Sequence, residues 1–297
     1  MNGLFYANKF ELKNYLSLVK FSHTIFAMPF ALVGYMLGMV HIGGDFDLRL
    51  LILVVLCMVF ARSAAMAFNR WLDREIDAKN PRTIIREIPS GIIKADSALV
   101  FVVLSCIFFI TTTWCINTIC FLLSPVALLV VLGYSYTKRF TSLCHLVLGL
   151  GLSLAPVGAY LAVTGTFDLV PVLMGFSVLF WVAGFDIIYA LQDEDFDKQN
   201  DLFSIPVRMG RNRSMRWSEG LHLASALFLI ASLVVFNHKI SLGYPALAGL
   251  VIFLGMLIYQ HIIIKPTDLS RVNLAFFTTN GIASVIFGVL FISDLIY

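Results

Sequence analysis

Long apolar runs recur along nearly the whole chain, and they restrict its fold more than any other feature of the sequence. Each run has about 18–24 residues, enough to cross a hydrocarbon core of roughly 30 Å as a helix. Lipid offers no partners for backbone polar groups, so continuous apolar runs without strand-like alternation must form helices. We count nine such runs, at residues 17–40, 48–69, 97–114, 117–137, 143–164, 170–191, 218–237, 243–264 and 273–293.

The composition indicates the same class of protein. Hydrophobic residues make up 59% of the 297 residues, charged residues make up only 13%, and the mean hydropathy is +0.89. Soluble domains carry about 25% charged residues. The sequence therefore predicts an all-α polytopic membrane protein, with nine transmembrane helices in one bundle that forms a single membrane-embedded domain over residues 1–297.

Two further features of the sequence carry no chemistry. The first fourteen residues are mixed and polar, and the apolar run that follows lacks a small-residue cleavage site, so we expect no removable signal peptide. The cysteines have no metal-ligand spacing and lie in or beside apolar runs, so we expect them to pack against lipid or protein. They are Cys57, Cys106, Cys115, Cys120 and Cys144.

The basic residues are distributed unevenly between the two sides of the predicted bundle. Of the 21 Lys and Arg residues, 18 fall on the side that holds the N-terminus and the connections after runs two, four, six and eight. Arg49 and Lys239 fall on the other side, and Arg62 lies within the second run. By the positive-inside rule we expect the first side to face the cytoplasm, as in a bacterial-type inner membrane. The net charge of +3 is too small to indicate nucleic-acid binding.

Two acidic motifs follow apolar runs on this predicted cytoplasmic side. Asp73 and Asp77 follow the second run, and Asp193 and Asp197 follow the sixth. Four residues separate the carboxylates within each motif, which is just over one helical turn, so both lie on one helix face. The offset from Asp73 to Asp193 equals the offset from Asp77 to Asp197, 120 residues. The motif-bearing parts, which we expect to be pseudo-repeats, are about 17–137 and 143–297.

The residue types in and around the two motifs indicate metal and phosphate. Gathered carboxylates repel one another unless a cation lies between them, and hard divalent cations such as Mg²⁺ prefer oxygen ligands. Asn69 adds an amide one turn before Asp73. Nearby Lys and Arg residues suit phosphate oxygens, so the combination predicts a site for a metal-complexed polyanion, most simply a diphosphate. The basic residues are Arg82, Arg86, Lys138 and Arg139.

At these residues the chain resembles the UbiA superfamily of membrane-embedded aromatic prenyltransferases. The resemblance covers nearly the whole chain and includes the nine spans, an NxxxDxxxD motif after the second run and a DxxxD motif after the sixth. Two segments, at residues 62–66 and 189–193, are similar to the quinone-pathway branch of that superfamily. The other supporting matches are Arg82-Thr83, Arg86, Pro89-Ser90-Gly91 and Lys138-Arg139.

The resemblance implies transfer of a polyprenyl group from a polyprenyl diphosphate to the ring of an aromatic acid. The implied acceptor is 4-hydroxybenzoate or a related dihydroxynaphthoate, in ubiquinone or menaquinone biosynthesis, and the implied cavity is central and open to the cytoplasmic face. Mg²⁺ would assist ionisation to an allylic cation, which the electron-rich ring attacks. The implied Mg²⁺ ligands are Asn69, Asp73, Asp77, Asp193 and Asp197, and the implied pyrophosphate contacts are Arg82, Arg86, Lys138 and Arg139.

Two ionisable residues lie at membrane depth, where such groups are costly and usually face a cavity in which they act. Arg62 lies seven residues before Asn69, and Asp186 lies seven before Asp193, with Tyr189 between them. Our hypothesis, which the resemblance supports for Arg62, is that Arg62 binds the acceptor's carboxylate. Asp186 then orients or deprotonates the phenol, and Tyr189 is a further substrate contact. In the alternative, Arg62 and Asp186 only satisfy one another within the bundle.

The chain departs from the family pattern at two positions. Arg70 stands where some members carry an acid, and Phe203 stands where many carry Lys or His, which bears on one expected phosphate contact. Asp201 fits both a further ligand and a solvated helix end. The acidic residues that we expect to be solvated surface groups are Glu75, Glu194 and Asp195.

Two other kinds of function fit parts of the pattern. Other members of the superfamily use haem, homogentisate or a chlorophyllide as the acceptor. Cation-coupled transporters also combine repeated halves with membrane carboxylates, but their sites lie near the midplane. The acids of this chain lie at helix ends beside Lys and Arg. No motif indicates a protein partner, so the expected partners are the polyprenyl diphosphate, the aromatic acid and membrane lipid.

Overall fold

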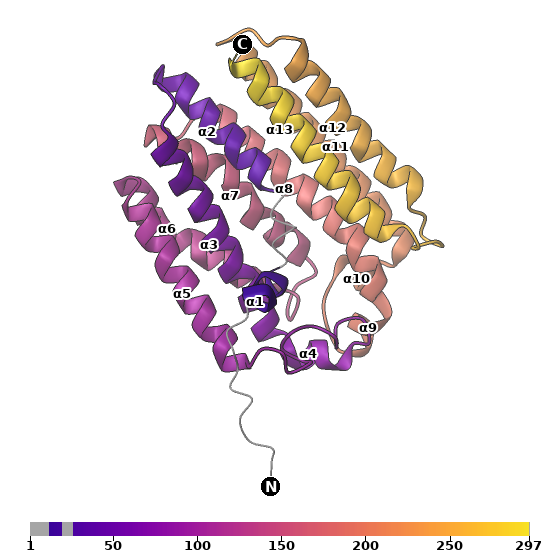
Figure 1. Ribbon diagram of the computed structural model, residues 1–297. Helices are drawn as coiled ribbons and strands as arrows, with labels where there is room; N and C mark the ends of the chain where they lie inside the picture. Colours follow the sequence, from indigo (N-terminus) through magenta and orange to yellow (C-terminus); the bar gives the residue numbers. More distant parts are fainter. Residues whose placement is uncertain (1–11, 20–25, 297) are drawn as a thin grey trace.

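The computed structural model describes residues 12–19 and 26–296. Its long helices run along one another as a bundle, with short helices gathered at one end (Figure 1). Eight segments are long and apolar enough to cross a membrane, judged by length and composition. They contain α3 (Leu48–Leu72), α5 (Ala95–Trp114), α6 (Thr118–Thr137), α7 (Cys144–Thr164), α8 (Leu169–Ala190), α10 (Ile205–Met209) with α11 (Arg211–Asn237), α12 (Tyr244–Ile263), and the π-helical turn η3 (Leu274–Thr279) with α13 (Asn280–Ile296). The described residues contain no β-strand, which confirms the all-α prediction.

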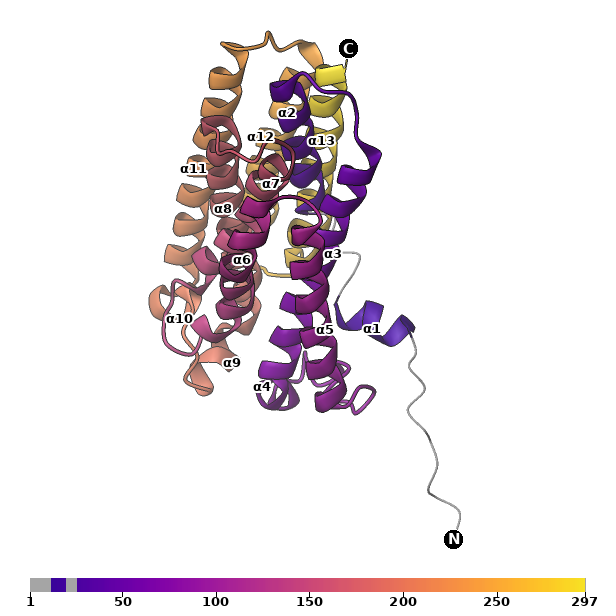
Figure 2. The same cartoon turned by 90° about the vertical axis from the view of Figure 1, so that its left-hand side faces the viewer.

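The first predicted run, residues 17–40, is not one continuous helix in the described residues. Its beginning belongs to α1 (Leu12–Leu18), which lies across the bundle instead of along it (Figure 2). Its later part belongs to α2 (Met28–Ile42), an apolar helix of 15 residues with a proline in its first turn. Proline lacks a backbone N–H, and this costs nothing there because first-turn N–H groups have no acceptor within the helix. Residues 20–25 lie outside the described residues, so a ninth span stays a prediction.

The turn between the third and fourth predicted runs has no Gly or Pro, and the structure confirms its position. The helix α5 ends at Trp114, and α6 begins at Thr118. Asn117 caps α6, because its Oδ1 accepts the backbone N–H of Cys120 at 2.9 Å. Its Nδ2 donates to the carbonyl of Leu161 in α7, also at 2.9 Å. One asparagine therefore starts α6 and fastens the hairpin to α7.

Glycines allow α7 to approach both of its neighbours closely. A Cβ added at Gly34 of α2 would collide with the backbone carbonyl of Pro156 in α7. A Cβ added at Gly149 of α7 would likewise collide with the backbone carbonyl of Leu179 in α8. Small residues at such crossings let membrane helices pack backbone against backbone. The three helices α2, α7 and α8 thus form a tightly packed centre.

Aromatic side chains fill the space between α2, α8, α12 and α13. Phe30, Trp181, Phe253 and Phe287 are all fully buried, and the rings of Phe30 and Trp181 lie 5.5 Å apart. The indole Nε1 of Trp181 donates to Asn280 Oδ1 at 2.8 Å, so its one polar atom is satisfied. This packing holds α8, which leads into the second acidic motif.

Both acidic motifs lie at the same end of the bundle, away from the C-terminus (Figures 1 and 2). The first continues from α3 into α4 (Arg74–Lys79). The second continues from α8 through the 3₁₀ turn η2 (Leu191–Asp193) into α9 (Glu194–Gln199). The fold therefore brings together two chain segments that are far apart in the sequence.

Candidate active site

The loop after the first motif contacts the second motif directly. Arg82 binds Asp193 through two hydrogen bonds, from Nε to Oδ1 at 3.0 Å and from Nη2 to Oδ2 at 2.6 Å. Asn80 donates from Nδ2 to Asp193 Oδ1 at 3.4 Å. Burial alone lowers the pKa of the Arg82 guanidinium, but hydrogen bonding to Asp193 and the negative charge of that carboxylate outweigh burial and raise this pKa. The two motifs thus form one site.

Asp73 of the first motif is buried and paired with two cations from the end of α6. Lys138 Nζ lies 2.7 Å from Asp73 Oδ2, and Arg139 Nη2 lies 2.8 Å from Oδ1. Asn69 donates from Nδ2 to the same carboxylate at 3.2 Å, which leaves the amide Oδ1 of Asn69 as an acceptor. Because Asp73 is only 1% exposed, its charge depends on these partners.

Asp77 is also buried and has its partner in its own loop. Arg86 Nη1 donates to both carboxylate oxygens of Asp77, at 2.7 and 2.8 Å. Thr83 Oγ1 donates to the backbone carbonyl of Asp77 at 3.1 Å, which folds the loop back onto α4. The predicted phosphate contact Arg86 therefore lies against the first motif.

Asp197 is half-buried in α9 and makes no ion pair within 4 Å among the residues that the structure describes. It interacts electrostatically with Asp193, Lys138 and Arg82. The same lysine that binds Asp73 of the first motif thus faces Asp197 of the second. All four predicted phosphate-binding cations lie beside the acidic motifs.

The oxygen donors of this site fit a hard cation by their chemistry, although they are not gathered into a preformed metal cage. Among the described residues, no group of three or more His, Cys, Asp or Glu side chains is placed to hold a metal ion. Lys and Arg lie between the carboxylates instead. These are also the groups that bind phosphate oxygens. The site is therefore suited to a metal that arrives together with a phosphate-bearing ligand.

Tyr189 joins this site through Arg82. Its hydroxyl accepts a hydrogen bond from Arg82 Nη1 at 3.1 Å, and the guanidinium carbon lies 5.4 Å from the ring centroid. On its other side the ring packs against Phe276 of the π-helical turn η3, with centroids 4.2 Å apart. Tyr189 thus fixes the orientation of Arg82 between an aromatic face and the carboxylate of Asp193.

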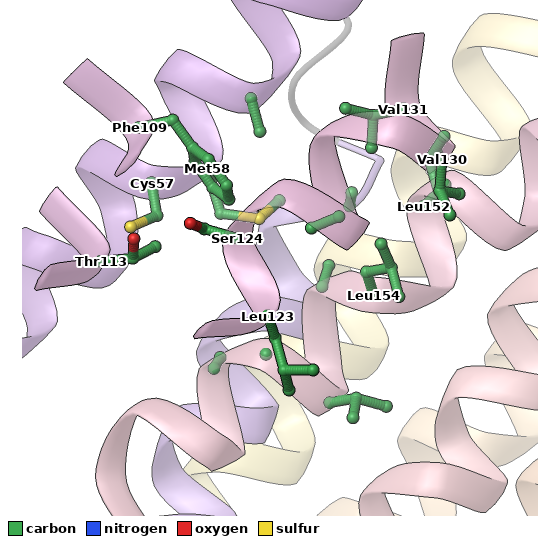
Figure 3. Close-up of a pocket in the computed structure, with 18 of the residues that line it drawn as sticks. Cys57, Met58, Phe109, Thr113, Leu123, Ser124, Val130, Val131, Leu152 and Leu154 are labelled. Atoms are coloured by element: carbon green, nitrogen blue, oxygen red, sulfur yellow. The ribbon is translucent and has the colours of Figure 1, made fainter. Parts of the chain in front are cut away.

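An apolar cavity of about 380 Å³ lies between α3, α5, α6 and α7 (Figure 3). Arg62, Met66 and Tyr134 line the end nearest the motifs, and Thr113 and Ile116 line it further along α5 and the hairpin. The Nε atom of Arg62 is buried without a hydrogen-bond partner among the described residues. The guanidinium of Arg62 therefore lies at the edge of a mostly apolar chamber.

Asp186 is not paired with Arg62 in the described part of the chain, which argues against mutual neutralisation of these two charges. Its Oδ2 lies 2.7 Å from Nδ1 of His145, at the start of α7. Tyr134 interacts electrostatically with Arg62, Asp186 and Asp73. Sequence reasoning missed His145 and Tyr134. His145 lies at the start of its apolar run, so the depth that singled out Arg62 could not have marked it.

The two departures from the family pattern have distinct structural roles. Arg70 is buried, its Nε has no partner among the described residues, and it interacts electrostatically with Asp77 and Glu87. Phe203 is 48% exposed, but its backbone N–H donates to the carbonyl of Lys138 at 2.7 Å. The backbone at residue 203 therefore still reaches the cationic loop, although its side chain carries no charge.

The remaining acidic residues separate into solvated and paired groups. Glu75 and Asp195 expose 83% and 85% of their side chains, which confirms the expectation for both. The same expectation is wrong for Glu194, whose side chain is only 20% exposed and binds Arg211 Nε at 2.9 Å. Asp201 is exposed just after α9 with a φ of 53°, the conformation of a helix-end residue.

The described residues thus place two aspartate motifs, their cations and an apolar chamber in one bundle of apolar helices. A family model described as the UbiA prenyltransferase family matches residues 27–282. The chain therefore belongs to the UbiA prenyltransferase family.

Known proteins resemble this chain in sequence and in fold. The 4-hydroxybenzoate octaprenyltransferase of Aliivibrio fischeri (strain MJ11) is 30% identical over 243 residues, which are 81% of this chain and 82% of that protein. The apo structure of a UbiA homolog from Aeropyrum pernix K1 has a TM-score of 0.81 and 32% identity, over 92% of this chain and 98% of that one. A UbiA homolog from Archaeoglobus fulgidus bound to DMAPP and Mg²⁺ shares the fold, with a TM-score of 0.72 and 20% identity over 95% of this chain and 99% of that one.

Proposed function

We propose that this protein transfers a polyprenyl group from a polyprenyl diphosphate to the ring of 4-hydroxybenzoate or a related dihydroxynaphthoate. The contact between Arg82 and Asp193 carries this proposal, because it unites the two acidic motifs in one site. That site adjoins an apolar cavity into which Arg62 enters. A relative at 30% identity is named a 4-hydroxybenzoate octaprenyltransferase, which supports an acceptor of this class.

The cations of the site bind the diphosphate of the donor. In the structure each of them already lies against a carboxylate, so an incoming phosphate takes over Lys138, Arg139, Arg82 and Arg86 from their aspartates. The carboxylates of the aspartates are then free to bind a metal cation. Mg²⁺ supplies positive charge that stabilises the leaving pyrophosphate, and its proposed ligands are Asn69, Asp73, Asp77, Asp193 and Asp197.

The apolar cavity accommodates the polyprenyl chain. When the bond between the allylic carbon and the diphosphate oxygen breaks, the oxygen keeps the electron pair and the carbon becomes an allylic cation. Preorganised charge around the leaving group supplies the largest part of such catalysis. The apolar lining excludes water that would otherwise capture the cation.

The acceptor lies between the cavity and the acidic motifs. Arg62 binds its carboxylate, which satisfies a guanidinium that has an unpaired Nε. Asp186 orients the phenol and accepts its proton, so that the electron-rich ring carbon beside the oxygen attacks the allylic cation. That carbon then loses its own proton and the oxygen regains one from Asp186, which restores the aromatic phenol. Tyr134, which interacts electrostatically with both Arg62 and Asp186, forms the wall between these two contacts.

The proposed placement follows from the charge distribution. The N-terminus and the end that holds the motifs face the cytoplasm, because 18 of the 21 Lys and Arg residues lie on that side. In this proposal the cavity opens to the same face. We place a ninth span over the later part of the first apolar run, where α2 is described. The whole chain forms one domain with two pseudo-repeated motif-bearing parts.

One experiment tests the proposed reaction. Purified protein is incubated with Mg²⁺ and a polyprenyl diphosphate, with 4-hydroxybenzoate and dihydroxynaphthoate offered in parallel, and prenylated product and pyrophosphate are measured. We expect product from one of these acids and none from Asp73→Asn. If neither acid is prenylated, homogentisate, haem and a chlorophyllide are offered next, and product from one of them would assign another acceptor within the family. Full activity of a folded Asp73→Asn variant would refute the roles given to the acidic motifs.

A further inference from the structure

His145 and Asp186 form a buried pair between α7 and α8, beside the proposed acceptor site. His145 Nδ1 lies 2.7 Å from Asp186 Oδ2. The histidine side chain is 3% exposed, whereas 23% of the Asp186 side chain is exposed. Asp186 Oδ1 has no hydrogen bond among the described residues. One oxygen of Asp186 is therefore held, and the other is available.

The second nitrogen of His145 decides where the ring carries its proton. The backbone N–H of Ile205, the first residue of α10, points at His145 Nε2 at 3.4 Å. A backbone N–H only donates, so Nε2 must offer its lone pair. The proton of the neutral imidazole consequently lies on Nδ1 and is donated to Asp186. This hydrogen-bond pattern makes Asp186 Oδ2 the acceptor of the Nδ1 proton.

The same backbone segment also reaches the cationic loop. Two residues before Ile205, the N–H of Phe203 donates to the carbonyl of Lys138 at 2.7 Å. Ser204 between them caps α10, because its Oγ accepts the N–H of Val207 at 3.3 Å. A short segment with fixed hydrogen bonds thus links the lysine that binds Asp73 to the histidine that holds Asp186.

We infer that His145 is a positioning residue, which holds Asp186 Oδ2 so that Oδ1 faces the acceptor's phenol, and that residues 203–205 tie this pair to the diphosphate end of the site. The inference rests on the proposed function. In the step that Asp186 performs, the phenol O–H bond breaks, the proton moves to Asp186 Oδ1, and the electron pair stays on the phenolate oxygen. His145 keeps its proton on Nδ1 throughout.

Two substitutions separate positioning from proton transfer. In His145→Gln, the amide nitrogen donates to Asp186 and the amide oxygen accepts the N–H of Ile205, but the side chain does not ionise. We expect its kcat to stay close to that of the wild type. In His145→Leu both bonds are lost, and we expect kcat to fall by about 10²-fold, the effect of a slightly misplaced catalytic group. KM for the polyprenyl diphosphate should be unchanged.

The outcomes of this comparison are distinct. Wild-type turnover in His145→Leu would overturn the positioning role. A loss in His145→Gln as large as in His145→Leu would mean that the ring exchanges protons and would overturn the inference as stated. An inactive wild type would instead refute the proposed function, so the two failures are distinguishable.

A substrate-free measurement tests the hydrogen-bond geometry itself. The full chain is labelled with ¹⁵N-histidine in detergent micelles, and the resonances that His145→Gln lacks are assigned to His145. We expect one protonated and one unprotonated ring nitrogen, and a shift of the protonated one in Asp186→Asn. A doubly protonated ring, or no response to Asp186→Asn, would overturn the assigned pair.

Discussion

Arg82 and Asp193 are 111 residues apart in the sequence, yet Arg82 Nη2 and Asp193 Oδ2 lie 2.6 Å apart. Arg82 comes from the loop after the first acidic motif, and Asp193 belongs to the second. Their contact fixes the separation of two helix ends that belong to different parts of the bundle. The proposed reaction depends on this separation, because in it one diphosphate must reach both motifs.

We expect Asp193→Asn to lower turnover by at least about 10²-fold, since loss of one preorganised charge at a reacting centre has an effect of this size. The measurement is prenylated product formed by purified protein. Asp195→Asn is the matched control, because Asp195 lies two residues away with a side chain that is 85% exposed. Equal losses in both variants would show that the effect is not specific to the contact with Arg82.

Removal of divalent cations should abolish turnover, and added Mg²⁺ should restore it. Without the metal, the carboxylates of the site repel the diphosphate. A second readout is thermal unfolding: inorganic pyrophosphate should stabilise the protein only when Mg²⁺ is present, by about 2.7 kcal/mol at roughly 100 times its Kd. Undiminished activity in excess chelator would contradict the metal assignment.

Arg62→Leu should raise KM for the aromatic acid and leave KM for the polyprenyl diphosphate unchanged. Loss of a charge-assisted hydrogen bond weakens binding by about 1.5–3 kcal/mol, so the expected increase is roughly 10–100-fold. Arg49→Leu serves as the control, because Arg49 is an exposed arginine near the other end of α3. An unchanged acceptor KM in a folded Arg62→Leu protein would remove Arg62 from the acceptor site.

A bulkier side chain in the cavity should shorten the donor that the enzyme accepts. Ala127 of α6 lines the cavity, so Ala127→Phe should lower kcat/KM for octaprenyl diphosphate by about tenfold or more and affect geranyl diphosphate far less. Leu129→Phe is the control, because Leu129 lies on the same helix and is 72% exposed. The same ratio of donors in both variants would show that the chain lies elsewhere.

Gly149→Ala should destabilise the fold, because the added methyl group meets the backbone carbonyl of Leu179. Overpacking of this kind costs about 1–3 kcal/mol. Gly255→Ala in α12 is the control, since nothing lies within 4 Å of a Cβ added there. Thermal unfolding in detergent measures both variants. Equal melting temperatures would mean that α7 and α8 have room to separate.

Hydropathy and spacing predicted much of the architecture, because lipid leaves a continuous apolar run few alternatives to a helix. The position of α6 followed from its run of apolar residues, although the cap at Asn117 went unnoticed. The shared location of the two motifs followed from run order alone. The separation of α1 from α2 was not predicted, because residues 17–40 read as one continuous apolar run.

The pairing of charges within the site was less accessible to sequence reasoning. Arg86 lies near Asp77 in the chain, so its contact is local. Which cation binds Asp73 depends instead on how α6 packs beside α3, and only the structure shows Lys138 and Arg139 there. The same is true of His145 and Asp186, which meet only because Gly149 lets α7 approach α8.

The ion pairs at the motif-bearing end of the bundle, here called its mouth, affect how a charged ligand can bind. Asp73, Asp77 and Asp193 each have a basic partner within 2.8 Å, so the resting mouth carries its own counterions. In the proposed reaction an arriving diphosphate takes over these cations, and the aspartates that they leave become free to hold a metal ion. After the diphosphate departs, the same cations can pair with the aspartates again.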